Sequence, residues 1–256
     1  MALLEMTFFA ETLQRFTDVT VIIPVENTGI LKRKKPEHFP TLYLLHGYTG
    51  NSKDWLSYAN VRTIAEECNL AVVMPSGENG FYVDNEKLEI YNGKFIKELV
   101  DYTRRIFPLS SNREDTFIGG LSMGGFGAMR NGAAYADVFS KIFSLSGAFI
   151  LDDILEKKTN LTVGQGYYDR VFGSRDSVKA GNSNPIVCFE KAKERGNVPE
   201  IYMACGTEDF LIEHNRKTKE ILNGMGISPV YCEAEGIHDW KFWNTWLPKA
   251  VEWLMS

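Results

Sequence analysis

A serine with a glycine two residues to either side follows an apolar run near the middle of the chain. The run ends at Ile118, and the motif extends from Gly120 through Ser122 to Gly124. This pattern is typical of a nucleophile elbow, a sharp turn from a strand into a helix. A side chain at either glycine would collide with its neighbours in that turn, and the strained turn presents the serine hydroxyl to a base. The motif therefore predicts a serine hydrolase.

Strand and helix patterns alternate through most of the chain, which predicts an α/β fold with a mostly parallel central sheet and helices on both faces. The segments 6–10 and 18–24 are expected to form an antiparallel edge at the N-terminal side of this sheet. We find no repeat, low-complexity tract or linker, so residues 1–256 are expected to form a single domain. Short continuous apolar runs typical of doubly covered strands occupy 41–45 and 70–74, and further strands are expected at 142–146 and 201–205.

The second half of the chain is less regular. Residues 147–185 are rich in glycine, tyrosine and asparagine, and we expect an irregular excursion that lines or caps a pocket at the carboxyl edge of the sheet. After it, a helix over 210–223 is expected to end at Gly224. An aromatic-rich helix should close the chain, and Pro248 inside it should kink or split it.

Charge and composition bear on partners and location. The chain has 28 basic and 33 acidic residues and a net charge of −5, which argues against a nucleic acid or an anionic membrane as its main partner. Its start lacks the pattern of a signal peptide, and no apolar run is long enough to span a bilayer. A cytoplasmic location with reduced thiols is therefore expected, and a homo-oligomer is left open. We expect no metal and no organic cofactor.

A serine hydroxyl needs a base to take its proton during attack, and histidine suits that role near neutral pH. In folds built around such an elbow the order along the chain is serine, then acid, then histidine. His38 and His46 precede Ser122 and do not fit this order. His214 lies inside an expected helix, whereas His238 follows the last expected strand. His238 is therefore the predicted base.

The acid should follow the preceding strand, where the sequence offers Glu208 and Asp209. We predict Asp209, because one helix and one strand separate it from His238, as one βα unit would. Glu208 is the weaker alternative, and Asp239 is a third, disfavoured because neighbouring side chains rarely turn toward each other with the required geometry.

The oxyanion of an acyl-transfer intermediate needs two amide donors. One is expected from Met123, which follows the nucleophile, and the other from the loop after the strand at 41–45. We assign that second donor to the amide of Tyr48, with Gly47 close behind, and expect His46 to brace the loop rather than to act as a catalyst.

Four stretches of the sequence together resemble the esterase D-type branch of the α/β-hydrolases, which includes tributyrin esterases, acetyl-xylan and feruloyl esterases, and S-formylglutathione hydrolases. The resemblance implies the α/β-hydrolase fold, with Ser122 as nucleophile, Asp209 as orienting acid and His238 as general base. The likeness is greatest to short-acyl esterases, because the loop at 47–52 lacks the cysteine usual in formylglutathione hydrolases. The matching stretches are 44–51 with Trp55, 119–127, 205–210 and 236–240.

These observations predict a serine carboxylesterase that acts on short-chain acyl esters, acetyl to butyryl, or on aryl esters through an acyl-enzyme. The partner expected is a small-molecule ester, and Trp55, Tyr82 and Tyr168 are the candidate walls of its pocket. The alternatives are a feruloyl or acetyl-xylan-type esterase acting on plant oligosaccharides, an S-formylglutathione hydrolase, and an acyltransferase of the same fold. A hydrolase-like scaffold used only for binding is a further, disfavoured alternative.

Overall fold

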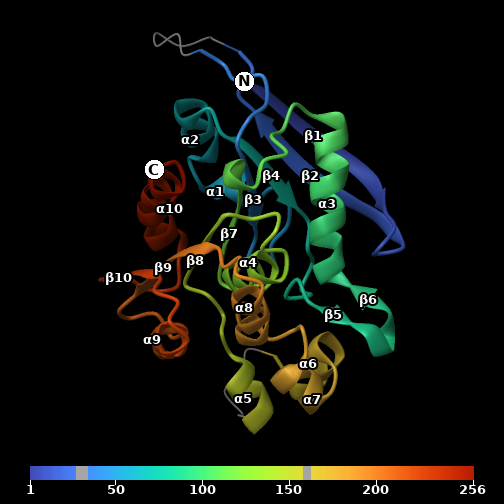
Figure 1. The fold of residues 1–256 in the computed structure, drawn as a ribbon, viewed down its shortest axis with the longest axis vertical. Coiled ribbons are helices and arrows are strands. Elements are labelled where there is room, and N and C mark those ends of the chain that lie inside the picture. The colour runs from blue at the N-terminus through green and yellow to red at the C-terminus, as the bar shows by residue number, and fades with distance from the viewer. Residues whose placement is uncertain (27–33, 158–162) are drawn as a thin grey trace.

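A computed structural model describes residues 1–26, 34–157 and 163–256. Its centre is an eight-stranded sheet in the order β1-β2-β4-β3-β7-β8-β9-β10 (Figure 1). The strands from β4 to β10 pair in parallel, while β1 with β2 and β2 with β4 pair antiparallel. The predicted parallel sheet with an antiparallel N-terminal edge is therefore confirmed. The strands are β1 (Ala2–Ala10), β2 (Arg15–Ile23), β3 (Thr41–Leu45), β4 (Ala71–Pro75), β7 (Thr116–Leu121), β8 (Lys141–Leu145), β9 (Glu200–Gly206) and β10 (Val230–Ala234).

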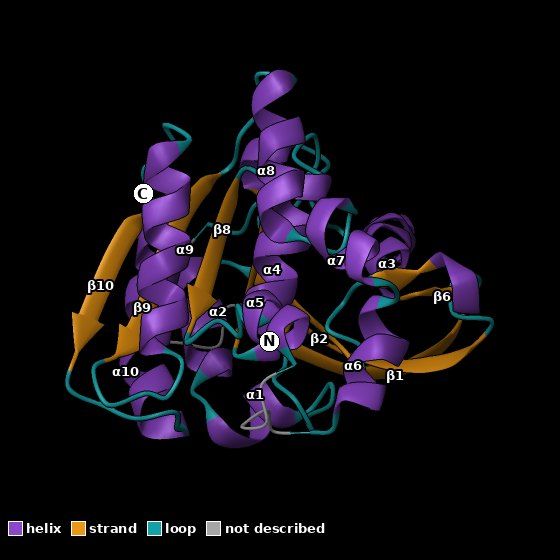
Figure 2. Cartoon of the chain, turned by 90° about the horizontal axis from the view of Figure 1, so that it is seen from below, coloured by secondary structure: helices purple, strands orange, loops and turns teal. Residues whose placement is uncertain are grey.

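Helices cover both faces of the sheet (Figure 2). Because side chains alternate across a strand, β3 divides its apolar residues between two cores. Leu42 and Leu44 pack with α2 (Val61–Cys68) and α10 (Trp240–Leu254), whereas Tyr43 and Leu45 pack with α3 (Asn92–Ile106), α4 (Met123–Ala134) and α8 (Pro185–Glu194). This double cover explains why the central strands are continuous apolar runs.

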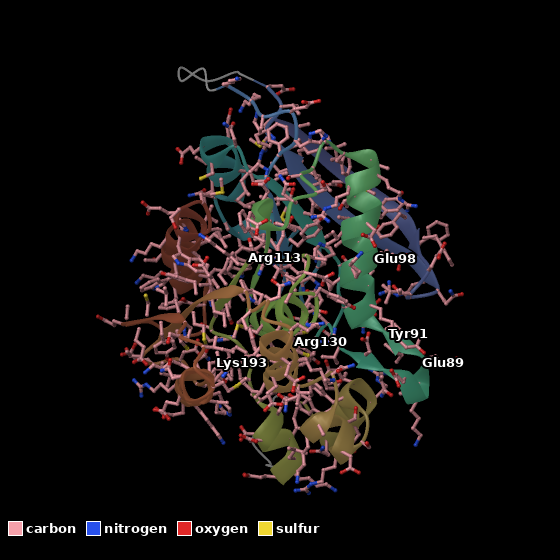
Figure 3. The ribbon with its side chains drawn as sticks, viewed as in Figure 1. Glu89, Tyr91, Glu98, Arg113, Arg130 and Lys193 are labelled. Carbon is pink, nitrogen blue, oxygen red and sulfur yellow. The ribbon has the colours of Figure 1, made fainter. Side chains whose placement is uncertain are left out.

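The N-terminal hairpin, which extends beyond the rest of the sheet, is tied to α3 by one carboxylate. Glu98 of α3 accepts hydrogen bonds from the backbone amides of Glu11 and Thr12 at 2.6 and 2.9 Å (Figure 3). Both amides lie in the turn between β1 and β2. The edge of the sheet is thus fixed to a helix that the rest of the core holds in place.

The expectation of an irregular excursion over 147–185 is wrong for most of its described residues. They form α5 (Leu151–Glu156), α6 (Gln165–Phe172) and α7 (Arg175–Ala180), which gather at one end of the molecule (Figure 1). The part at 158–162 lies outside the described residues. Each helix is short, so its apolar periodicity is weak, and α7 depends on a Ser174 cap that accepts from the Ser177 amide.

Two expectations about the last helices are also corrected. Helix α9 (Ile212–Gly224) includes Gly224, and the left-handed glycine after it is Gly226, with φ 75°. Helix α10 is not split at Pro248 but continuous through it, because a broad apolar face that includes Trp243 and Leu247 is buried against the sheet. The free energy gained by burying this apolar face offsets the loss of the one backbone hydrogen bond that a proline cannot donate.

The remaining elements are short. Helix α1 (Asp54–Tyr58) follows β3, and β5 (Asp84–Asn85) pairs with β6 (Ile90–Tyr91) in a separate two-stranded sheet. In the described part of the chain there are also two 3-10 turns, Glu86–Leu88 and Arg113–Asp115. Within the described ranges, none of the helices combines the length and the apolar character needed to cross a membrane.

Candidate active site

Ser122 lies in the turn between β7 and α4 with a strained backbone, φ 53° and ψ −119°. An ideal Cβ on Gly120 would lie 2.5 Å from the backbone carbon of Gly124, and one on Gly124 would lie 2.3 Å from the carbonyl oxygen of Leu45. Both contacts are with backbone, which cannot move aside as a flexible side chain can. Glycine is therefore required at both positions for the helix to pack against the adjacent strand.

Three loops at the carboxyl ends of β7, β9 and β10 bring the predicted serine, acid and histidine together. The Nε2 atom of His238 lies 3.0 Å from Oγ of Ser122. On the other side of the same ring, Nδ1 lies 2.9 Å from Oδ2 of Asp209. A Ser–His–Asp chain of this geometry can pass a proton from the hydroxyl to the imidazole while the carboxylate fixes the ring.

The environment of Asp209 keeps its carboxylate charged. Its side chain is fully buried, and burial raises its pKa, but hydrogen bonding and charge from His238 lower that pKa more. The amide of Leu211 donates to Oδ1 at 2.9 Å and adds to the lowering. The net effect is a pKa below the ordinary value, so the acid is an anion that can hold the imidazole in one tautomer.

The two alternative acids face elsewhere. Glu208 is exposed and accepts from the amide of Gly236 at 2.6 Å. Asp239 is the N-cap of α10, where its carboxylate accepts from the amide of Phe242 at 2.9 Å. Asp209 is thus the carboxylate of these three that contacts His238.

Aromatic rings hold the histidine in place. The ring of Phe210 lies 4.7 Å from that of His238, and Trp243 meets the same imidazole edge-on at 5.0 Å. The indole of Trp243 is itself fixed, because it donates to Oγ of Ser146 at 3.1 Å. The imidazole therefore has little freedom to rotate away from Ser122.

The expected amide donors lie beside the serine. An ideal Cβ on Gly47 would be 3.6 Å from Cβ of Ser122, so the loop after β3 passes directly against this serine. Gly47, Tyr48 and Met123 all line the cavity that contains Ser122. Among the described residues, no acceptor for the amide of Tyr48 or Met123 is found. Both donors are thus available to an oxyanion.

The cavity that Ser122 lines has a volume of 680 Å³. Of the three predicted wall residues, Tyr168 lines it. Sequence reasoning missed Phe210, Trp240 and Trp243, although each lies within five residues of the predicted acid or histidine in the sequence. Their proximity to those residues was the available signal. The lining also includes Asn51, Asp54, Tyr58, Phe81, Leu121, Ala148, Ile150 and Val163.

Trp55 and Tyr82 support this cavity from behind rather than line it, which corrects the expectation for both. Trp55 is 1% exposed, and its indole donates to the carbonyl of Leu45 at 3.0 Å. Tyr82 is fully buried, and its hydroxyl donates to the carbonyl of His46 at 3.1 Å. Each uses its polar atom to satisfy a buried backbone carbonyl near the end of β3, so neither is free to contact a ligand.

Comparison with known sequences places the chain in a family. The model of the "Putative esterase" family matches residues 11–254. The chain belongs to this esterase family. An acetyl esterase of Caldicellulosiruptor saccharolyticus is 42% identical to it, with 99% of this chain and 98% of the relative covered.

Solved structures agree with the family assignment. The fluorophosphonate-binding serine hydrolase FphF of Staphylococcus aureus is 26% identical, with a TM-score of 0.86 over 100% of this chain and 98% of that one. The S-formylglutathione hydrolase FrmB of the same organism matches with the same TM-score, 0.86, and identity, 26%, over 100% and 99%. This esterase-family chain is therefore a carboxylic ester hydrolase with the α/β-hydrolase fold. In the described ranges, no group of three or more His, Cys, Asp and Glu side chains is arranged to hold a metal ion.

Proposed function

We propose that this esterase cleaves short-chain acyl esters, acetyl esters first, through an acyl-enzyme on Ser122. The observation that carries the proposal is the hydrogen-bonded chain from Ser122 through His238 to buried Asp209, because Ser122 and His238 line a cavity together with Tyr48 and Met123. Its substrate is a small-molecule ester, and water is the acceptor of the acyl group.

In the first half-reaction, His238 Nε2 takes the proton of the Ser122 hydroxyl as its oxygen attacks the ester carbonyl. The carbonyl oxygen becomes an oxyanion, which the amides of Met123 and Tyr48 stabilise by hydrogen bonds. The tetrahedral intermediate then expels the alcohol, and His238 returns the proton to it. The products of this half are the free alcohol and an acyl ester of Ser122.

In the second half-reaction, His238 takes a proton from a water molecule, whose oxygen attacks the acyl carbon. The same two amides stabilise the second oxyanion, and the proton returns to the oxygen of Ser122 as the acid leaves. Asp209 stays ionised throughout and stabilises the imidazolium through Nδ1.

One finding supports a short acyl group. The acetyl esterase of Caldicellulosiruptor saccharolyticus is 42% identical to this chain over nearly the whole length of both proteins.

A thioester substrate is the second candidate, favoured by the likeness to an S-formylglutathione hydrolase at 26% identity. The chemistry is the same, with a thiol in place of the alcohol as leaving group. The two candidates differ in which substrate gives the higher kcat/KM, so one panel separates them.

The experiment has two parts. A panel of p-nitrophenyl esters from acetyl to decanoyl, with methyl ferulate and S-formylglutathione, should give the highest kcat/KM with acetyl or another short ester. A fluorophosphonate probe should label the wild-type chain and not Ser122→Ala, whose kcat should fall by about 10⁴-fold or more without loss of the fold. Undiminished turnover by Ser122→Ala would exclude the proposal.

An acceptor experiment addresses the acyltransferase alternative. Product ratios are measured with p-nitrophenyl acetate in the absence and presence of an added alcohol. Free acetate is expected as the main product in both cases, whereas an acetylated alcohol as the main product would favour transfer over hydrolysis.

A further inference from the structure

Two buried side chains that do not line the cavity hold the backbone of the loop that supplies the Tyr48 amide. Nδ1 of His46 lies 2.7 Å from the carbonyl oxygen of Gly47. The hydroxyl of Tyr82 donates to the carbonyl oxygen of His46, one peptide earlier, at 3.1 Å. His46 is 1% exposed and Tyr82 is fully buried.

A third backbone group fixes the tautomer of His46. The amide of Gly77 donates to Nε2 of His46 at 2.9 Å. A backbone N–H can only donate, so Nε2 must be the acceptor and the ring proton must be on Nδ1. The Nδ1–H group therefore donates to the Gly47 carbonyl. Burial lowers the pKa of His46, which favours the same neutral ring.

The hydrogen bond to the Gly47 carbonyl also orients the Tyr48 amide, because both belong to one planar peptide group. In a trans peptide the C=O and N–H bonds point in opposite directions, so fixing one fixes the other. The Gly47 carbonyl accepts a second hydrogen bond, from the amide of Gly50 at 3.1 Å. With two donors on its oxygen, this peptide cannot rotate without breaking both bonds.

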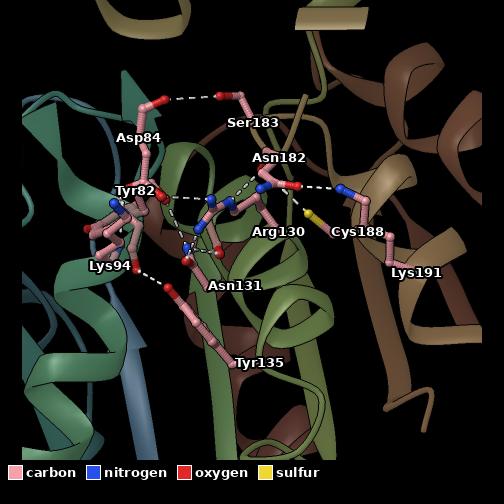
Figure 4. A network of polar contacts seen from close by, with 12 residues as sticks. Tyr82, Asp84, Lys94, Arg130, Asn131, Tyr135, Asn182, Ser183, Cys188 and Lys191 are labelled. Carbon is pink, nitrogen blue, oxygen red and sulfur yellow. Dashed lines mark hydrogen bonds and ion pairs between the residues drawn. The ribbon is translucent and has the colours of Figure 1, made fainter. Parts of the chain in front are cut away.

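The tyrosine is itself held firmly. Its ring fits between two glycines, since an ideal Cβ on Gly77 or Gly127 would lie 2.0 or 2.4 Å from a ring carbon of Tyr82. Its carbonyl accepts from Nδ2 of Asn131 in α4 at 3.0 Å. Asn131 belongs to the polar network in which Arg130 pairs with Asp84 at 3.0 Å (Figure 4).

We propose that His46 is a positioning residue for the esterase reaction. Its Nδ1–H, together with the hydroxyl of Tyr82, holds the peptide between Gly47 and Tyr48 so that the Tyr48 amide is directed at the oxyanion. This inference rests on the proposed function, because it explains what holds the Tyr48 amide, one of the two proposed oxyanion donors, in its orientation. His46 touches neither substrate nor nucleophile in this scheme.

Two amide variants separate this role from simple support of the fold. The amide of an asparagine lies near the place of Nδ1, and that of a glutamine near the place of Nε2. His46→Asn can keep the donor to Gly47, whereas His46→Gln keeps only the contact with Gly77. With p-nitrophenyl acetate, His46→Gln should lose about 100-fold in kcat with KM within about twofold, as for loss of an oxyanion donor.

His46→Asn should retain a kcat about tenfold or more above that of His46→Gln. A residue that only fills space and bonds Gly77 would give the reverse order, because glutamine is nearer to histidine in length. A kcat for His46→Gln equal to or above that of His46→Asn would overturn the proposal. Tyr82→Phe, which removes one oxygen atom, should lower kcat roughly two- to tenfold with KM unchanged.

If both His46 variants fail to fold, the proposal is tested by the tautomer of His46 itself. The sample is the His238→Gln variant with nitrogen-15 in its histidines, and its spectra should show a neutral His46 ring that carries its proton on Nδ1. A His46 ring protonated at Nε2 would overturn the proposal. Failure of the proposed function is recognised separately, by turnover that survives in Ser122→Ala. If the fluorophosphonate probe labels Ser122 of the wild type but kcat is higher for His46→Gln than for His46→Asn, only the role of His46 is excluded. The proposed function then stands.

Discussion

Asp209 lies 2.9 Å from Nδ1 of His238, although a whole helix and strand separate them along the chain. The carboxylate next to His238 in the sequence, Asp239, turns instead to the first turn of α10 and accepts from the Phe242 amide. Proximity in the fold and proximity in the sequence therefore assign different carboxylates to the histidine, and the difference can be tested.

Asp209→Asn should lower kcat by about 10³- to 10⁴-fold, because an asparagine amide cannot hold the imidazole with its proton on Nδ1 as a carboxylate does. The measurement is kcat with p-nitrophenyl acetate, with circular dichroism to verify the fold. Asp239→Asn is the matched control. It should keep kcat within about threefold, because its side chain only caps α10, where asparagine caps as well as aspartate. Comparable losses in both variants would contradict the assignment.

Gly124→Ala should destabilise the fold by at least about 1–3 kcal/mol, because its Cβ would lie 2.3 Å from the Leu45 carbonyl oxygen. The elbow must then shift, so esterase activity should fall as well. Urea unfolding and kcat measure the two effects.

Gly224→Ala provides the control for the same chemical change. Gly224 lies in α9, and nothing stands within 4 Å of its ideal Cβ. This variant should keep full activity and be as stable as the wild type or up to about 1 kcal/mol more stable. A Gly124→Ala protein as stable and active as Gly224→Ala would show that the elbow does not need its glycine.

The stability of the protein at low pH should depend on Asp209. Its pKa in the folded protein lies below the ordinary value, so it contributes stability above the unfolded pKa of about 3.9 and loses it as the pH falls through the folded pKa. Below about pH 4, the free energy of unfolding of the wild type should therefore fall more steeply than that of Asp209→Asn. Urea unfolding between pH 6 and 2.5 compares the two, and parallel curves would show that Asp209 does not titrate differently on folding.

Two aromatic variants should distinguish a residue that supports the cavity from behind, Trp55, from one that contacts the substrate, Phe210. Trp55→Phe loses a buried hydrogen bond to Leu45 and should cost about 1–3 kcal/mol of stability with KM nearly unchanged. Phe210 is 67% exposed and lines the cavity, so Phe210→Ala should leave the stability nearly unchanged and alter KM across the ester panel. Thermal unfolding and KM are measured for both variants. A change of KM in Trp55→Phe but not in Phe210→Ala would contradict the assignment of Phe210 to the cavity wall and of Trp55 to the layer behind it.

Much of the fold was predictable because its signals are local. The continuous apolar runs predicted β3 and β4, and the glycines around Ser122 predicted the elbow, because each pattern depends on neighbours along the chain. The short helices between 147 and 185 were not predicted, since few turns give too little periodicity and their stability comes from contacts with other parts of the molecule. The same reason explains the continuous α10, where burial outweighs the effect of Pro248.

Local sequence patterns were enough to predict the order of serine, acid and histidine and the strand ends that carry them. Parallel strands bring these carboxyl ends to one edge of the sheet. The carboxylate that faces His238, and the place of Trp55 and Tyr82 behind the cavity wall, depend on three-dimensional packing. The Nδ1 proton of His46 depends on it too, because the Gly77 amide that imposes this tautomer reaches the ring from the loop after β4. Such facts depend on directions in space between residues far apart in the chain, and no local pattern records them.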